Sequence, residues 1–298
     1  MDRTLRIGAR GSKLALWQAK YTQQQLNAVG VESELVILQS AGELMQPGFV
    51  RQTEGKAHFV KSTGEALLRG DIDLAVHSLK DLPTEMPSGL VITAVSHRAD
   101  PADWLVIRRE SREQAMLLQL KEQAVVGASN ARRKAQLQDF RPDLRVRDVS
   151  GNMATKLGRL AQGDFDAVVL AAAGLTALEI DLTEFHILPF NPREFVPAPG
   201  QGVMAFQTCA DDLVVRRLIK QIHHPEASAA TNVERATLRL LGHDHRAQLG
   251  VYCERDGQGN YHVWAALADE GSGTVKRAHL SSSTSFQLPE KIVAALKR

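Results

Sequence analysis

The chain has 298 residues, of which 44% are hydrophobic and 23% are charged, and its formal net charge is +2. This composition is typical of a globular protein with two or three domains and excludes a disordered or fibrous chain. The longest uninterrupted apolar run, residues 167–175, is too short to span a bilayer, so we expect no membrane association. With only Cys209 and Cys253, the chain is expected to lack a disulfide framework and to reside in a reducing cytoplasm.

Strand-like and helix-like segments alternate through the first two thirds of the chain. In the first half, the hydrophobic periodicity predicts a strand at 4–10, a helix at 12–30, a strand at 33–40, a helix at 59–70, and strands at 71–78 and 90–96. In the second half it predicts a strand at 124–129, a helix at 130–140, a strand at 144–151, a helix at 152–163 and a strand at 165–174. This alternation predicts an α/β fold with mostly parallel strands.

Two pairs of segments repeat in the same order. "IGARGSKLALWQA" resembles "VGASNARRKAQLQ", and "LLRGDIDLAV" resembles "LAQGDFDAVV". The first copy is longer, and we expect much of its insertion to form a long loop over residues 41–58. We interpret the repeat as two similar lobes with a ligand cleft between them, at the carboxyl ends of their strands.

Polar and proline-rich segments mark the expected domain boundaries. Residues 96–103 suit the crossing from the first lobe to the second, and residues 189–202, with four prolines and two glycines, suit the return. We therefore expect lobe one in residues 1–98 and 196–214, lobe two in residues 99–195, and a small α+β domain in residues 215–298. The last domain is predicted to contain a hairpin that turns at Asp256-Gly257 and a final helix.

Residues 130–160 carry a local excess of positive charge. The basic residues are Arg132, Arg133, Lys134, Arg141, Arg145, Arg147, Lys156 and Arg159, against Asp139, Asp143 and Asp148. Because Phe140 is the one aromatic residue of this stretch, nucleic acid is a poor match, and a compact carboxylate-bearing small molecule fits better. A solvated helix face is an equally good interpretation of the composition alone.

Three short segments of the chain carry candidate residues for an anion-binding cleft. Arg132 and Arg133 lie in the first turn of a predicted helix, where basic side chains oppose the helix dipole unless an anion is held there. Lys80 and Asp81 directly follow a buried strand, where cleft residues are expected, although a surface pair in a turn is more frequent. Arg10 occupies the equivalent place in the first copy of the repeat.

A series of motifs runs in order along nearly the whole chain: "ARGSKLALWQA", "FVK", "DLAVHSLKDLP", "ARRKAQL", "RPDL", "GNMATKLGRL", "AGL", "PAPGQG" and "NVERA". Together they resemble the hydroxymethylbilane synthase family, also called porphobilinogen deaminase. The resemblance implies two lobes like those of periplasmic binding proteins and a small third domain. It also implies a transferase of porphyrin (tetrapyrrole) biosynthesis, which joins four porphobilinogen molecules with release of ammonia on a dipyrromethane cofactor held by a cysteine thioether.

The resemblance also implies site residues. Asp81 matches the catalytic aspartate, whose fixed carboxylate offsets positive charge as ammonia leaves. The positions that match cofactor contacts are Lys80, Asn130, Arg132, Arg133 and Lys156, and those that match substrate contacts are Arg10, Ser12, Lys56 and Ser150. Around Lys56 the usual Gly-Gly-Lys-Gly of the family is replaced by "EGKA".

The match fails at the point of cofactor attachment. Counted from Glu234, the cofactor-bearing cysteine of the family falls on His245. Imidazole is a weaker nucleophile than a thiolate, so we expect no covalent dipyrromethane here. Three family arginines are also replaced, by Ser150, Lys156 and Ala177, which removes positive charge at two positions and the bidentate guanidinium fork at the third.

The sequence His243-Asp244-His245 fits either a metal site or an exposed turn. Histidines at positions i and i+2 converge on a metal only in extended or turn geometry, so we favour the exposed turn and expect no metal.

Two functions fit these observations. The first is an enzyme of the hydroxymethylbilane synthase type that acts on porphobilinogen or a related carboxylate-bearing pyrrole, with any dipyrromethane held noncovalently. The alternative is a non-polymerising paralogue that binds, or performs a different reaction on, a small anionic ligand in the cleft between the lobes. We expect a cytoplasmic monomer whose partner is a small carboxylate-bearing ligand rather than nucleic acid or a membrane.

Overall fold

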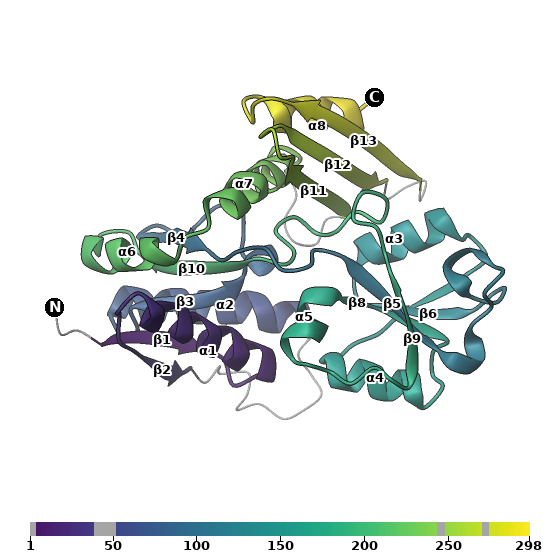
Figure 1. The fold of residues 1–298 in the computed structure, drawn as a ribbon, viewed down its shortest axis with the longest axis horizontal. Helices are drawn as coiled ribbons and strands as arrows, with labels where there is room; N and C mark the ends of the chain where they lie inside the picture. Colours follow the sequence, from purple (N-terminus) through teal and green to yellow (C-terminus); the bar gives the residue numbers. More distant parts are fainter. Residues whose placement is uncertain (1–3, 39–51, 243–247, 270–273) are drawn as a thin grey trace. The chain divides into compact units, whose positions relative to one another are not determined.

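The structure is a computed structural model that describes residues 4–38, 52–242, 248–269 and 274–298, with the backbone alone described for 52–59 (Figure 1). The chain forms two compact units. Unit 1 comprises Met1–Ala99 with Val203–Ser228, and unit 2 comprises Asp100–Gly202 with Ala229–Arg298. The three-domain boundaries expected from the sequence stay a prediction.

Unit 1 is built on a five-stranded sheet in the order β2-β1-β3-β10-β4. Its strands are β1 (Leu5–Ala9), β2 (Ser33–Ile37), β3 (Leu74–Ser78), β4 (Leu90–Val95) and β10 (Met204–Cys209). β1 pairs in parallel with β2 and β3, whereas β10 runs antiparallel to both β3 and β4. The late strand β10 therefore joins two strands from the beginning of the chain.

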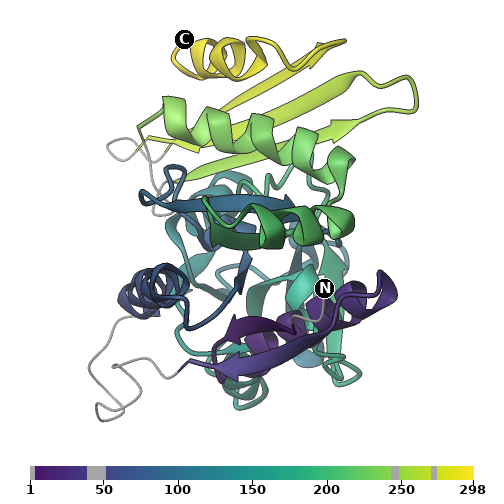
Figure 2. The ribbon, with the colours of Figure 1, turned by 90° about the vertical axis from the view of Figure 1, so that its left-hand side faces the viewer.

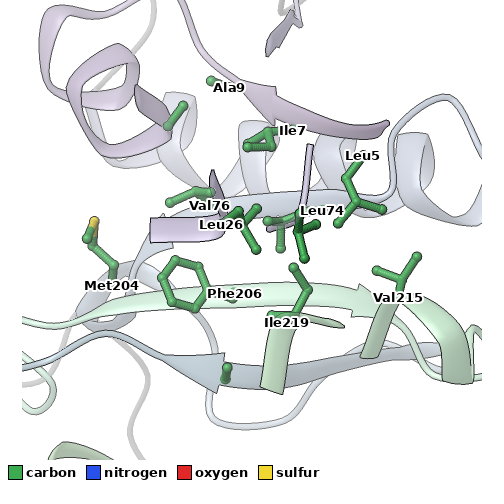
Figure 3. Packing of buried hydrophobic residues seen from close by; sticks show 13 residues of the cluster. Leu5, Ile7, Ala9, Leu26, Leu74, Val76, Met204, Phe206, Val215 and Ile219 are labelled. Atoms are coloured by element: carbon green, nitrogen blue, oxygen red, sulfur yellow. The ribbon is translucent and has the colours of Figure 1, made fainter. Parts of the chain in front are cut away.

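Helices cover both faces of this sheet. α1 (Lys13–Ala28) and α6 (Leu213–Ile219) pack on one face, and α2 (Gln52–Arg69) packs on the other. Figure 3 shows the first of these cores, in which Leu5 and Ile7 of β1 and Phe206 of β10 meet Leu26 of α1 and Ile219 of α6. Leu5, Ile7 and Ala9, at alternate positions of β1, all contribute to this core, which is the period of two expected of a strand.

Unit 2 contains a second five-stranded sheet, in the order β7-β6-β8-β5-β9. Its strands are β5 (Asp103–Arg108), β6 (Val125–Ala128), β7 (Arg145–Asp148), β8 (Ala167–Ala171) and β9 (Phe185–Pro189). β6 is parallel to β7 and β8, and β5 is antiparallel to β8 and β9, so the order and directions repeat those of the first sheet. α3 (Ala131–Phe140) covers one face, and α4 (Met153–Ala161) and α5 (Ala172–Ala177) cover the other. The prediction of two similar α/β lobes is confirmed.

The end of the chain adds a three-stranded antiparallel sheet to unit 2. It consists of β11 (Leu249–Arg255), β12 (Tyr261–Ala268) and β13 (Val275–Ser282). α7 (Pro225–Leu240) and α8 (Leu288–Leu296) contribute side chains to one apolar cluster with this sheet, beside which Figure 2 shows both helices. The predicted hairpin at Asp256-Gly257 and the small α+β element are confirmed.

Short 3-10 helices occur at η1 (Leu79–Asp81), η2 (Arg109–Ser111), η3 (Leu117–Gln119) and η4 (Lys220–Ile222).

The expected long loop over residues 41–58 is wrong in its second part. α2 begins at Gln52, so residues 52–58 are helical, while residues 41–51 lie outside the described residues. The helix extends seven residues before the apolar periodicity begins at Phe59, because an established helix adds each further residue at small cost without needing a buried face there. Within the described ranges, none of the helices is long and apolar enough to cross a membrane.

Candidate functional site

The predicted site residues of unit 1 gather at one edge of its sheet. Arg10 directly follows β1, and Ser12 caps α1 by accepting a hydrogen bond of 3.3 Å from the backbone N–H of Ala15. η1, which carries Lys80 and Asp81, directly follows β3. Because β1 and β3 are parallel neighbours, their carboxyl ends bring these residues to the same edge.

His77 lies in β3 next to this edge and is buried, with its Nε2 atom 3.2 Å from Oε1 of Gln207. Burial lowers the pKa of His77 from 6.5 to about 4, the hydrogen bond to Gln207 and the charge of Asp81 oppose this shift, and the charge of Arg10 adds to it. Asp81 and Arg10 therefore both act electrostatically on one buried imidazole. His77 is neutral at physiological pH and joins β3 to β10 through its hydrogen bond to Gln207.

We expect His77 to make unit 1 less stable in acid. The unfolded chain binds a proton at His77 below about pH 6.5, whereas the folded chain does so only near pH 4. The contribution of His77 to the free energy of unfolding is therefore fully present above about pH 6.5. It falls by about 3 kcal/mol in total as the pH drops towards 4. Urea unfolding between pH 7 and pH 4 measures this loss. In His77→Gln, whose side chain cannot titrate, this part of the pH dependence should vanish. If the free energy of unfolding changes equally with pH in both proteins, the assignment to His77 is wrong.

In unit 2, Asn130 and the arginine pair lie at the start of α3, directly after β6. The Asn130 side chain caps the helix by accepting a hydrogen bond of 2.9 Å from the backbone N–H of Arg133. The side chains of Arg132 and Arg133 do not extend into solvent: the two residues are 3% and 5% exposed. Both guanidinium groups reach Asp103, at 2.7 Å from Nη2 of Arg132 to Oδ2 and 2.6 Å from Nη2 of Arg133 to Oδ1.

This cluster is buried and carries one excess positive charge. Asp103 is fully buried, which alone would raise its pKa, but the guanidinium groups of Arg133 and Arg132 hold the pKa of this carboxyl well below its usual range. Nη1 of Arg132 donates to the Val196 carbonyl at 2.8 Å, and Nη1 of Arg133 donates to the Val169 carbonyl at 3.0 Å. Within the described residues, the buried Nε atom of each arginine has no hydrogen-bond partner. Buried N–H donors require acceptors, so the cluster is suited to an anion.

Lys156 and Ser150 lie at the same edge of the second sheet, since both follow β7, the parallel neighbour of β6. Lys156 is in α4, which Asn152 caps, and is buried, whereas Ser150 is exposed in the connection that precedes the helix. Ala177 is the last residue of α5, which follows β8. The structure therefore gathers Asn130, Arg132, Arg133, Ser150 and Lys156 in unit 2, and Arg10, Ser12, Lys80 and Asp81 in unit 1. The expected cleft between the lobes and the ligand contacts of these residues stay predictions.

Four predicted positions cannot be placed in this way. Lys56 is in α2, but its side chain is not among those described, and His243, Asp244 and His245 lie outside the described residues, as does their predicted turn. Among the residues that are described, no group of three or more His, Cys, Asp or Glu side chains is arranged to hold a metal ion.

Three residues that the sequence analysis missed organise the unit 2 site. Asp103 receives both arginines, and its Oδ1 atom also accepts a hydrogen bond of 2.9 Å from Nε2 of Gln201. The fully buried Glu234 of α7 accepts hydrogen bonds from the backbone N–H groups of Gly200, at 2.6 Å, and Cys253, at 2.8 Å. A carboxylate at the head of the apolar strand "DWLVI" is a signal that could have identified Asp103, because such a buried charge needs a cationic partner.

Comparison with known proteins gives consistent matches. Residues 5–217 match the family model described as "Porphobilinogen deaminase, dipyromethane cofactor binding domain". The chain is 39% identical to a porphobilinogen deaminase of Thermus thermophilus, over 95% of this chain and 91% of that protein. It is also 39% identical to one of Campylobacter hominis, over 85% and 81% of the two chains. Among solved structures, the periplasmic VFT2 domain of Bordetella pertussis BvgS is similar with a TM-score of 0.43 at 14% identity, over 74% of this chain and 86% of that one.

Proposed function

Because the chain belongs to the porphobilinogen deaminase family, we propose that it is a transferase of tetrapyrrole biosynthesis that binds porphobilinogen or a related carboxylate-bearing pyrrole. The observation that carries this proposal is the arginine pair of α3. Two buried guanidinium groups share one carboxylate and retain two Nε–H donors without partners in the described part of the chain. Guanidinium N–H donors form strong charge-assisted hydrogen bonds with a carboxylate.

The same observation fits a dipyrromethane, which carries carboxylates and, when bound, supplies the pyrrole ring to which further rings are joined. In this proposal Arg132 and Arg133 hold the carboxylates, and Lys156 adds positive charge from α4. Asp81 lies near pyrrole nitrogens and stabilises the positive charge that develops as ammonia leaves. Asp81 suits this role because it is held in η1, next to the end of a buried strand.

We propose further that any dipyrromethane is held noncovalently, because His245 stands where the family has its attachment cysteine. Neither cysteine is a good substitute. Cys253 is buried in β11, and Cys209 lies in β10 of unit 1, where burial raises the pKa of its thiol and so reduces the reactive thiolate fraction. We also propose a reducing compartment such as the cytoplasm, in which a chain with only two cysteines needs no disulfide.

The purified chain is expected to have the mass of its sequence, with no covalently attached dipyrromethane. Intact-mass spectrometry under denaturing conditions measures this directly, and the same sample under native conditions reports a noncovalent ligand. A mass increase that survives denaturation and maps to any residue would show that a covalent anchor exists after all.

Replacing Arg133 by alanine is expected to weaken the binding of porphobilinogen at least about tenfold, because a charge-assisted hydrogen bond contributes about 1.5–3 kcal/mol. Titration calorimetry gives the dissociation constant. The matched control is Arg145→Ala, which removes an exposed arginine of β7 that contacts Gln123. If both variants bind like the unmodified chain, the arginine pair is not part of the ligand site.

The alternative function is that of a non-polymerising paralogue. It is favoured by Ser150 and Ala177, which place two uncharged side chains where the family has arginines and so weaken the hold on successive anionic rings. Binding of porphobilinogen without formation of hydroxymethylbilane would favour this alternative over the transferase.

A further inference from the structure

Asp103 occupies a special place in the second sheet. It is the first residue of β5 and pairs with Ala171, the last residue of the antiparallel strand β8. β8 is itself parallel to β6, after which α3 begins, so Asp103 lies at the edge from which the arginine pair emerges. Each oxygen of its carboxylate receives one arginine, and Oδ1 also receives Gln201.

The contacts of Asp103 determine where the two guanidinium groups lie. Two cations repel each other when they are adjacent in a buried site, and the carboxylate between them offsets this repulsion. On their other sides, the backbone carbonyls of Val196 and Val169 accept hydrogen bonds from the Nη1 atoms. Each guanidinium group has five N–H donors, and its Nε–H is one that has no acceptor within the described residues.

We propose that Asp103 is a positioning residue that holds Arg132 and Arg133 in a fixed pair whose remaining N–H donors receive a ligand carboxylate. The identity of the ligand rests on the function proposed above, whereas the positioning of the pair does not. Asp103 also limits the pair to one excess positive charge, which matches one carboxylate. Preorganised donors bind more tightly than donors that must first be ordered.

Three variants test this role. Asp103→Asn removes the charge but keeps an oxygen for Gln201, and Asp103→Glu keeps the charge but moves the carboxylate by one methylene group. The control is Asp166→Asn, which removes another carboxylate of unit 2 that accepts hydrogen bonds from Ser111 and from the backbone of Val125, both at 2.7 Å. Asp166 directly precedes β8 and so lies at the opposite edge of the sheet.

Two measurements are made on each full-length variant. The first is the rate at which phenylglyoxal, an arginine-specific reagent, labels Arg132 and Arg133, followed by peptide mass spectrometry. The second is the dissociation constant for porphobilinogen, from titration calorimetry. Thermal unfolding of each variant measures its stability. It distinguishes weaker binding caused by a general loss of stability from weaker binding caused by misplaced arginine side chains.

We expect Asp103→Asn to label at least tenfold faster at both arginines and to bind porphobilinogen at least tenfold more weakly. Asp103→Glu, with its charge intact, should bind at least threefold more weakly, and Asp166→Asn should match the unmodified chain in both measurements. If Asp103→Asn does not fold, Asp103→Glu decides: labelling and binding equal to those of the unmodified chain would overturn the proposal. Faster labelling of the Asp103 variants in a chain that binds no porphobilinogen would overturn the proposed function and support the positioning role.

Discussion

The His245→Cys protein is expected to form no more hydroxymethylbilane from porphobilinogen than the unmodified chain does. An attachment point is one requirement of chain building, and retention of each added anionic ring is another. Ser150 and Ala177 supply no positive charge for the carboxylates of these rings. Two missing charge-assisted contacts, at about 1.5–3 kcal/mol each, lower the rate by about a hundredfold or far more.

The informative comparison is between His245→Cys alone and the same change combined with Ser150→Arg, Lys156→Arg and Ala177→Arg. We expect turnover only in the combined variant, measured as hydroxymethylbilane released per enzyme. The three arginine changes without the cysteine serve as the control for the anchor. Robust turnover of His245→Cys alone would show that the arginine replacements are tolerated and that the proposed change in ligand retention is wrong.

Replacing Glu234 by alanine is expected to destabilise the protein by about 3–6 kcal/mol, since two buried backbone N–H groups lose a charged acceptor worth about 1.5–3 kcal/mol each. These groups belong to Gly200, in the segment that leads to Gln201, and to Cys253 in β11. Chemical denaturation measures the change in the free energy of unfolding.

The control for Glu234 is Glu226→Ala, in the first turn of the same helix. Glu226 is exposed, and its carboxylate interacts favourably with the dipole of α7. Removing this carboxylate should lower the free energy of unfolding by only about 0.3–1 kcal/mol. Equal effects of the two substitutions would mean that the bonds to Gly200 and Cys253 do not stabilise unit 2.

Much of the fold could be predicted because its signals are local. The repeated "GDID" and "GDFD" turns, each between a helix and a buried strand, led directly to the two similar sheets. The start of α2 could not be predicted, because the residues before Phe59 show no apolar periodicity. A helix that continues into a polar stretch leaves no signal in the spacing of apolar residues.

The sequence could indicate the candidate site residues but not the residues that hold them in place. The position of Arg132 and Arg133 in a first helical turn indicated an anion, and the structure shows that a buried internal anion, Asp103, already satisfies part of that charge. Asp103 is 29 residues before Arg132 in the chain, and Gln201 is 98 residues after Asp103. Contacts at such separations depend on how strands are ordered in the sheet, which no local pattern of residues encodes.

The position of β10 between β3 and β4 has a consequence for synthesis on the ribosome. Among the described strands, β4 pairs with β10 alone. The residues of β10, Met204–Cys209, are translated after all five strands of the second large sheet, which ends at Pro189. A nascent chain that has reached Pro189 can therefore complete the later sheet while β3 and β4 still present unpaired backbone groups. Of the two five-stranded sheets, the one that comes first in the gene is completed second, and during that interval its open strand edges are exposed to aggregation.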